Sequence, residues 1–398
     1  MTYFQSLSAA GFAATAISFG PARMSFGLFV PEFRSAFSMS TSQVGLVASL
    51  GFAGFFVALL IAQFLLNRKG PEAPVLSGLL AATIGLGIVA LAPNVGVLAT
   101  GVFLAASSAG FAWTPFNDAV HRKVRDADRP AALSEVSTGT SLGIALAGMV
   151  ALAMVLAGID WRVCWAVFAV ASAVALVANW AALRHVEKSP ESVPREGWRD
   201  LLGIASLPLF AIAFVFGVTS AVFISFAPER FADAGGVPGM SEDAAPALVF
   251  IFYGVFGLAG LVTGRARDVI GLSWLLRVLM ATGAASLALA ALLPSSWIGL
   301  ISSAGLQGIN VMMTSAVLAF WSERLFPRFP SLGFTAALLA TAAGNVVGPA
   351  LAGVASSTSG ASATFLGTAA MPLLVAMFIR DRWVTEQPDA ADCAGKSA

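Results

Sequence analysis

The sequence is poor in charged residues, in cysteine and in histidine. Charged residues make up only 11% of its 398 residues, whereas soluble domains carry roughly a quarter, so a soluble globular fold is excluded. The two cysteines, Cys164 and Cys393, are expected near opposite faces of a membrane, which excludes a disulfide framework. Both histidines, His121 and His185, fall between apolar stretches, which excludes a histidine metal site or proton relay inside those stretches.

Long apolar stretches are what the sequence has in abundance. Hydrophobic residues make up 58% of the chain, and windows of about 20 residues identify transmembrane helices. We therefore predict an all-α polytopic membrane protein with twelve transmembrane helices and no sizeable soluble domain. The expected spans are 7–31, 42–66, 73–92, 96–118, 132–157, 161–184, 201–227, 245–264, 272–293, 297–321, 332–355 and 361–380.

The basic residues predict the orientation of these spans. With the amino terminus inside, 17 Lys and Arg residues fall in cytoplasmic segments and only three, Arg34, Arg162 and Arg230, fall outside. Cytoplasmic loops carry an excess of Lys and Arg. Both termini are therefore predicted to be cytoplasmic, in a bacterial inner membrane.

The chain divides into two halves of similar length. The longest cytoplasmic connection, residues 185–200, contains two prolines and mixed charges and is predicted to be a linker. It separates an amino-terminal six-helix bundle, 1–184, from a carboxy-terminal one, 201–384. The polar residues 385–398 are predicted to form a disordered cytoplasmic tail.

The halves resemble each other in sequence at three places, with offsets of 197, 201 and 205 residues. The paired positions are Pro31 and Pro228, Gly70 and Gly271, and Gly143 and Gly348. Duplicated units of this size are how secondary transporters build alternating access, with a site between the halves near the membrane midplane.

Motifs in the loops resemble those of the major facilitator superfamily, over essentially the whole chain. Gly264-x3-Asp268-x2-Gly271 is similar to the family's motif between helices 8 and 9, and a degraded copy, with Asn67, Arg68 and Gly70, follows span 2. Residues 323–327 and 344–349 are similar to its usual link from helix 10 into helix 11. The resemblance implies two pseudo-symmetric six-helix bundles and a place near the family's monocarboxylate and organic-anion branches; it is specific for architecture and says little about the substrate.

Two departures from the family's patterns bear on function. Gly101 stands where proton-coupled members commonly have an arginine in helix 4. Ile144 stands where the helix-5 motif of drug/proton antiporters has proline. Both count against an antiporter.

Arg23 is a charge in the middle of the first span. No Asp, Glu, Lys or His lies within eight residues of it, and a charged side chain in hydrocarbon costs at least a few kcal/mol. One interpretation is structural, with the guanidinium bonded to the carbonyls of an unwound Gly20-Pro21 turn or to a neighbouring helix. The other is a cationic anchor for a carboxylate, which its five-donor fork suits.

Polar and aromatic residues of other spans are candidates for the same cavity. Trp113, Thr114 and Asn117 share one face of span 4, and Gln307 and Asn310 share one face of span 10. Helix packing is the alternative interpretation for the former face, and interhelical hydrogen bonds for the latter. Asn345 is a weaker candidate. The predicted substrate-binding residues are Arg23, Phe19, Phe26, Trp113, Thr114, Asn117, Thr219, Ser220, Tyr253, Gln307 and Asn310.

A further set is predicted to act in conformational change. Gly143 and Gly348 lie in small-x3-small patterns that allow close helix crossing, interpreted as the interface between the halves, with a kink at Pro349. Loop residues are expected to stabilise the outward-facing state: Asn67, Arg68, Gly70, Gly264, Asp268 and Gly271. Asp118 and Glu135 are candidates for an inner gate or a protonation site, the alternative being a solvated ion-pair network.

These features favour a secondary transporter of a small organic anion, most simply a monocarboxylate, acting as a symporter, exchanger or facilitator. The alternatives are efflux of an amphipathic drug or metabolite and a non-transporting membrane sensor on the same fold. No enzymatic constellation, metal, cofactor or nucleic-acid partner is predicted. The expected partners are the lipid bilayer, a small anionic substrate and, if transport is coupled, a proton.

Overall fold

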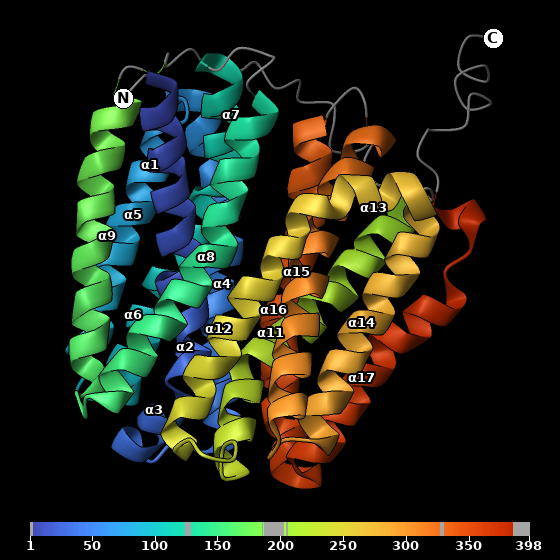
Figure 1. Cartoon of the computed structure of the whole chain (residues 1–398). Coiled ribbons are helices and arrows are strands. Elements are labelled where there is room, and N and C mark those ends of the chain that lie inside the picture. The colour runs from blue at the N-terminus through green and yellow to red at the C-terminus, as the bar shows by residue number, and fades with distance from the viewer. Residues whose placement is uncertain are drawn as a thin grey trace.

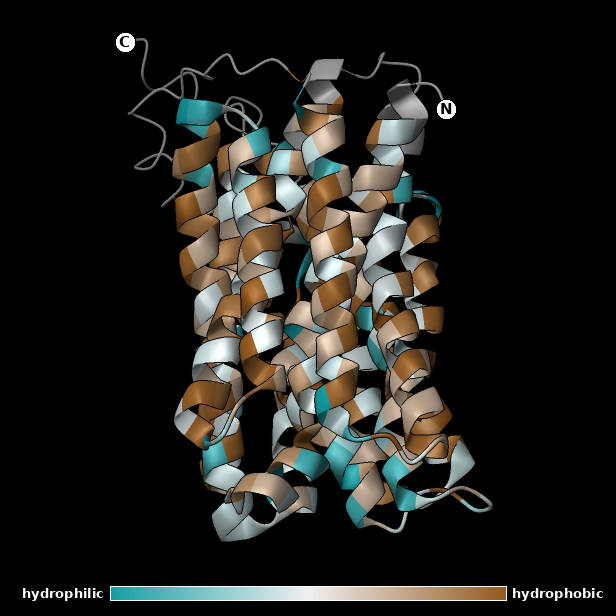
Figure 2. Cartoon of the chain, turned by 90° about the vertical axis from the view of Figure 1, so that its left-hand side faces the viewer, coloured by the Kyte–Doolittle hydropathy of each residue, from teal (hydrophilic) through white to brown (hydrophobic). Residues whose placement is uncertain are grey.

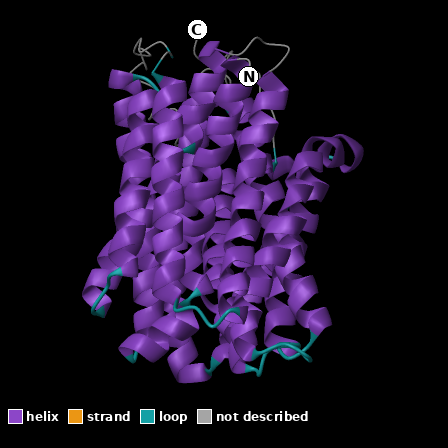
Figure 3. Cartoon of the chain, turned by 60° about the vertical axis from the view of Figure 1, so that its left-hand side comes forward, coloured by secondary structure: helices purple, strands orange, loops and turns teal. Residues whose placement is uncertain are grey.

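The computed structural model describes residues 3–123, 129–184, 186, 203, 206–326 and 330–384. Within these ranges it is built of helices joined by short loops, with no strand (Figure 3). The predicted tail, 385–398, and the predicted linker, 185–200, apart from residue 186, lie outside the described residues.

The first half of the chain forms helices that lie together on one side of the molecule (Figure 1). They are α1 (Tyr3–Ile17), η1 (Ser18–Met24), α2 (Ser25–Leu28), α3 (Val30–Phe37), α4 (Thr41–Lys69), α5 (Glu72–Ala90), α6 (Val95–Ser107), η2 (Ser108–Phe111), α7 (Trp113–Lys123), α8 (Arg129–Leu156) and α9 (Trp161–Leu183).

The second half forms a matching group on the other side (Figure 1). Its helices are α11 (Leu207–Asp233), η4 (Glu242–Ala244), α12 (Ala245–Gly257), η5 (Leu258–Val262), α13 (Thr263–Ile270), α14 (Leu272–Leu292), α15 (Trp297–Leu325), α16 (Pro330–Ser359), α17 (Ala361–Phe378) and η6 (Asp381–Trp383).

Eleven helices of the described chain are long and apolar enough to cross a membrane. The twelfth predicted span is the first one, which α1, η1 and α2 form together as a broken helix. Hydrophilic residues gather toward the ends of the helices (Figure 2), and apolar side chains on α9 point outward, with Val170 and Val174 each 65% exposed. An exposed apolar surface of this kind suits lipid, so the prediction of an integral membrane protein is confirmed.

The two faces of the molecule are defined by the chain's course. The terminal face is where α1 begins and α17 ends, and the far face is where α3 leads into α4 and α11 leads into η4. Two helices that start at the far face have side-chain caps: Ser40 and Gln43 form a capping box before α4, and Asn94 accepts from the Val97 amide at 3.0 Å before α6.

Two helices end at the terminal face with a glycine. Gly70 ends α4 with φ 73° and Gly271 ends α13 with φ 78°, a region of backbone conformation that other residues rarely adopt. The glycines of the sequence repeat are therefore turn residues that fix where the chain leaves each helix.

The largest contacts between the halves are those of α4 with α16, α8 with α12, and α2 with α11. Small residues permit each approach. A Cβ at Gly45 would collide with the carbonyl of Pro349, one at Gly254 with Ser141, and one at Gly27 with Ile224.

The predicted position of two glycines was wrong. Gly143 packs against Ala16 of α1, and Gly348 packs against Val218 of α11, so both lie within their own halves. Each allows a close crossing with the first helix of the same bundle, because the small-x3-small pattern specifies close approach but not the partner. Gly148, one turn further along α8, lies between the halves, against Ala247 and Phe250 of α12.

Candidate substrate site

The first span is broken at the position of Arg23. Pro21 has no amide hydrogen and cannot complete the α-helical ladder, and the helix widens into a π-helical segment, η1, over Ser18–Met24. Gly20 lets this segment touch the backbone of Gly143 on α8. Segments of π-helix occur often at functional sites because they redirect side chains.

Arg23 extends from η1 into a box of aromatic rings. Its guanidinium carbon lies 4.0 Å from the ring centre of Phe55, 5.4 Å from that of Phe19 and 5.5 Å from that of Phe52. Ring faces carry partial negative charge and attract a cation, by about 2 kcal/mol when water is excluded. The rings therefore stabilise the buried cation without neutralising it.

Asn345 of α16 reaches Arg23 from the opposite half. The groups around its amide fix one orientation, in which the amide nitrogen donates to the Gly217 carbonyl at 2.8 Å and the oxygen accepts from the Arg23 guanidinium at 2.8 Å. Asn345 is only 1% exposed. The bond therefore joins the two halves in the interior of the molecule.

Most of the hydrogen-bonding capacity of Arg23 is unused. A guanidinium has five N–H donors, and the bond to Asn345 takes one of them. The Arg23 Nε is buried without a partner, and no ion pair to Arg23 occurs among the described residues. Tyr253 of α12, 1% exposed, is near enough to interact with the charge electrostatically. The site is thus cationic and has donors to spare.

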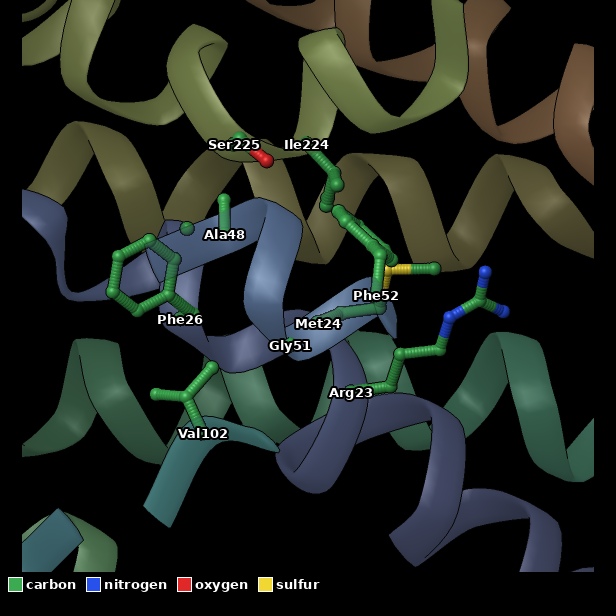
Figure 4. Close-up of a pocket in the computed structure, with 10 residues that line it drawn as sticks. Arg23, Met24, Phe26, Ala48, Gly51, Phe52, Val102, Ile224 and Ser225 are labelled. Carbon is green, nitrogen blue, oxygen red and sulfur yellow. The ribbon is translucent and has the colours of Figure 1, made fainter. Parts of the chain in front are cut away.

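The space beside Arg23 is small in this conformation. A cavity of about 10 Å³, between η1, α2, α4, α6 and α11, has Phe26, Val102 and Ser225 in its lining, and Figure 4 shows the guanidinium pointing away from Phe26 and Val102. That volume holds about one water molecule. An organic ligand can reach Arg23 only after the helices around it separate.

The residues predicted on span 4 lie on the terminal-face side of this region. Trp113 begins α7, and its indole packs on Phe334 of α16 with ring centres 5.8 Å apart. The Trp113 Nε1 and the Thr114 hydroxyl are buried without hydrogen-bond partners. Buried polar groups without partners are rare and mark a place for water or a ligand. The side chain of Asn117 lies outside the described residues.

The candidates from the second half fall into two groups. Tyr253 stacks on Phe223, and Gln307 is fully buried with both amide atoms unpartnered. Thr219 and Ser220 instead donate to carbonyls of their own helix, at 3.0 and 3.2 Å. Asn310 also has local partners: it accepts from Thr314 and packs against Gly283 of α14.

The structure therefore brings Arg23, Phe19 and Tyr253 together and adds Phe52, Phe55 and Asn345. Phe26 is separated from the guanidinium and stacks on Phe33, with ring centres 5.6 Å apart. No sequence signal marks Phe52 and Phe55, which are ordinary apolar residues of a span. Asn345 carried a weak signal, as an amide within an apolar helix.

The loop residues predicted to act in gating make mostly local contacts in this conformation. Arg68 lies over the Phe64 ring of its own helix, at 4.3 Å, and Asp268 pairs with the adjacent Arg267 at 2.7 Å. The first motif reaches the other half through Gln63, which donates to Asn67 and accepts from Thr335 of α16 at 3.4 Å.

The two acidic candidates carry little information here. Glu135 is exposed on α8, and the side chain of Asp118 lies outside the described residues.

A second polar region, missed by the sequence analysis, closes the far face. Arg34 of α3 pairs with Glu229 of α11 at 2.7 Å, and Glu229 is 5% exposed. A cavity of about 140 Å³ beside the pair is lined by Thr41, Ser356 and Thr364 among others. The sequence signal was the match of Pro31 with Pro228 in the repeat, each followed by a glutamate, which indicated duplication and not an ion pair.

Glu32 lies two residues before Arg34 on α3, just beyond the end of the predicted first span. Burial raises the pKa of its carboxyl to about 7, with the charge of Asp243 in the opposite half adding to the rise. Its Oε2 is buried and has no partner. The far face thus holds one attractive and one repulsive charge pair between the halves.

Comparison with known proteins identifies the architecture. The sequence profile of the Major Facilitator Superfamily matches residues 11–233, and no curated protein matches the chain. Among solved structures, a bacterial homolog of the human lysosomal transporter Spinster, in an inward-facing and unoccupied conformation, superposes with a TM-score of 0.74 at 15% identity, covering 95% of this chain and 96% of that one.

Two further transporters give similar superpositions. The peptide transporter POT in complex with sulfate has a TM-score of 0.75 at 15% identity, with 95% of this chain and 93% of that chain covered. A mutant of the nucleoside transporter NupG has a TM-score of 0.73 at 12% identity, with 94% and 98% covered. The profile spans more than half of the sequence and the folds agree along its length, so the chain belongs to the Major Facilitator Superfamily.

Proposed function

We propose that the protein is a secondary transporter that moves a small organic monoanion, a monocarboxylate in the simplest case, by alternating access. The observation that carries the proposal is Arg23: a guanidinium buried between the halves, with no acidic partner in the described chain and with an unpartnered Nε. A carboxylate supplies the acceptors that those donors lack.

The charge of the site favours a monoanion. One fixed cation is neutralised by one negative charge, whereas a phosphate ester would leave an excess. Moving one elementary charge across 100 mV is worth about 2.3 kcal/mol, so a neutralised site reorients more readily in a polarised membrane. The phenyl rings of Phe19, Phe52 and Phe55 supply an apolar surface for the organic part.

The other candidates would form the wall of the cavity once it opens. Trp113, Thr114 and Gln307 have buried polar atoms that need partners, and Tyr253 already interacts with the charge of Arg23. Phe26, Asn117, Thr219, Ser220 and Asn310 are retained as outer members of the set. They would contact the substrate in a conformation other than this one.

Transport in this proposal comes from rocking of residues 1–184 against residues 201–384, in a bacterial inner membrane with both termini cytoplasmic. The terminal face is then the cytoplasmic one. Asn67, Arg68, Gly264 and Asp268 would make new contacts across that face when it closes, while the glycine crossings at Gly143 and Gly348 and the kink at Pro349 let helices move as units.

Uptake into proteoliposomes tests the proposal. Radiolabelled acetate, lactate and benzoate are offered to wild type, to Arg23→Gln and to Arg277→Gln. Arg277 is the matched control, an arginine on α14 that lies over Trp274 at 4.8 Å and donates to the Ile379 carbonyl at 2.7 Å. We expect uptake by wild type and Arg277→Gln, and none by Arg23→Gln.

Other outcomes point to the alternative functions. Anion binding without flux in any condition indicates a sensor. Flux of amphipathic cations that Arg23→Gln does not change indicates drug or metabolite efflux. Equal anion uptake by wild type and Arg23→Gln contradicts the proposal.

A further inference from the structure

The Arg23 guanidinium donates a hydrogen bond to the amide oxygen of Asn345. Its length, 2.8 Å, is that of a charge-assisted hydrogen bond, and it comes from the half opposite to Arg23. The amide nitrogen is held by the Gly217 carbonyl, also at 2.8 Å, so the oxygen is aimed at the guanidinium and cannot rotate away without losing a second bond.

The surroundings of Asn345 explain why the residue can take this position. Gly344 and Gly348, on either side of it, bring α16 against Phe214 and Val218 of α11 without intervening side chains. The Asn345 side chain is thereby held at the contact between α11 and α16, with its nitrogen on α11 and its oxygen on η1. A neutral amide here satisfies one donor of Arg23 and leaves the charge intact.

We propose that the amide oxygen of Asn345 is an internal substitute for a substrate oxygen, which holds the Arg23 guanidinium in the empty transporter and is displaced by the substrate anion. This inference rests on the proposed function, because it assumes that an anion binds Arg23. In this proposal, Asn345 determines how readily the substrate-free transporter binds an anion and reorients.

The substitute has two opposite effects on transport. It competes with the anion, so it lowers the apparent affinity. It also keeps one donor of the empty cation hydrogen bonded between the halves, which lowers the cost of holding the guanidinium in a dry interior while the empty transporter reorients. Net transport requires the empty transporter to return, whereas exchange of one anion for another does not.

Substitutions at Asn345 separate these effects. Asn345→Ala removes the competitor, and we expect lactate to bind about tenfold more tightly, the size of one hydrogen bond to a charged group. In the same variant the rate of net lactate efflux should fall about tenfold relative to lactate–lactate exchange. Asn345→Asp places a carboxylate beside Arg23, and we expect it to weaken lactate binding by at least tenfold.

The measurements use full-length protein: titration of thermal stability with lactate, and paired net-efflux and exchange assays in proteoliposomes. Asn345→Ser is a second variant in case the alanine disturbs the contact between α11 and α16. Asn179→Ala is the matched control, since Asn179 is a fully buried amide on α9 whose nitrogen donates to the Ala175 carbonyl of the same helix. It should leave the affinity and the ratio of the two fluxes unchanged.

Two results support the inference. In Asn345→Ala or Asn345→Ser, lactate binds more tightly and the ratio of net efflux to exchange is lower; in Asn345→Asp, lactate binds more weakly. The inference is overturned if lactate binding, net efflux and exchange all fall together in Asn345→Ala and Asn345→Ser. It is also overturned if Asn345→Asp binds lactate with wild-type affinity. If Arg23→Gln bound lactate as tightly as wild type, the proposed function itself would be overturned. If Arg23→Gln weakens lactate binding but every Asn345 variant behaves like wild type, only the role of Asn345 is overturned.

Discussion

Two arginines of the first half, Arg23 on η1 and Arg34 on α3, meet the opposite half in different ways. Arg34, near the far face, is paired with the Glu229 carboxylate at 2.7 Å. Arg23, in the interior, meets an amide oxygen at 2.8 Å and three phenyl rings. A carboxylate neutralises its partner and leaves no charge for a ligand. An amide with aromatic rings holds the cation in place and keeps its charge available.

A structural ion pair differs from a binding site in the charge and the hydrogen-bond donors that remain without a partner. At the far face the charges of Arg34 and Glu229 cancel, and the bond connects α3 to α11. In the interior, one positive charge and an unpartnered Nε remain at Arg23. Both arginines hold the halves together, but only Arg23 is suited to hold an anion as well.

The largest expected effect comes from removing each charge in turn. Arg23→Gln should weaken binding of lactate by about 100-fold, since it removes a buried charge and the bidentate donor set. Arg34→Gln should leave the affinity within about threefold. A titration of thermal stability with lactate measures both, and equal losses in the two variants would remove the distinction between them.

The next effect tests closure of the far face. Glu229→Gln leaves Arg34 without its counter-charge, which should shift the population toward an open far face by about 2 kcal/mol, or roughly 30-fold. Double electron–electron resonance between spin labels at Leu91→Cys and Leu292→Cys reports this opening, because these exposed far-face residues belong to different halves. A label pair at Leu91→Cys and Ile159→Cys, both in the first half, should not change.

The pH dependence of closure follows from Glu32. Its pKa, about 7 with the far face closed, returns toward the usual 4.5 when the face opens and water reaches the carboxyl. The closed state therefore binds the proton more tightly, is favoured as the pH falls through 7, and loses that advantage above 7, by up to about tenfold between pH 6 and 8.

The groups that act on this carboxyl define the controls for the pH experiment. Asp243 of η4 and Cys164 of α9 interact with it, while Arg34, two residues further along α3, is neutralised by Glu229. Glu32→Gln should abolish the pH dependence of the label distances, and Asp243→Asn should move its midpoint to lower pH. A wild-type pH profile in Glu32→Gln would contradict this assignment.

The smallest effect concerns the rings around Arg23. Phe55→Leu keeps an apolar side chain but removes the ring nearest the guanidinium, and should lower the free energy of unfolding by about 1 kcal/mol more than Phe56→Leu does. Phe56 is the matched control, a half-buried phenyl next in sequence that does not lie over Arg23. Equal losses in thermal unfolding would show that the rings contribute packing alone.

Much of the fold could be predicted because lipid imposes it. A helix needs about 20 apolar residues to cross a bilayer, and the predicted span 42–66 lies within the observed Thr41–Lys69. The repeated glycines after spans 2 and 8 end α4 and α13, at positive φ values that most other residues rarely adopt. One interpretation of the sequence included an unwound turn at Gly20-Pro21, but the π-helical segment was not predicted. Such a segment changes the width of the helix without changing its hydropathy.

The side chains around Arg23 could be predicted only in part, for the same physical reason that two glycines were misplaced. Arg23 is visible in the sequence because a charge in a span is costly by itself. Its partners are not visible, because phenylalanines in α4 and an asparagine in α16 acquire their meaning from tertiary contacts. The small-x3-small pattern at Gly143 likewise specified a close crossing and left the choice of partner to the fold.

The most direct test of the central claim is to locate the bound anion. In a crystal structure with para-bromobenzoate, the anomalous signal of bromine marks the ligand and the density shows its carboxylate. We expect a carboxylate oxygen within hydrogen-bond distance of the Arg23 guanidinium, in the place that the Asn345 oxygen occupies in the empty protein. A ligand bound elsewhere, with the bond between Arg23 and Asn345 intact, would contradict the account.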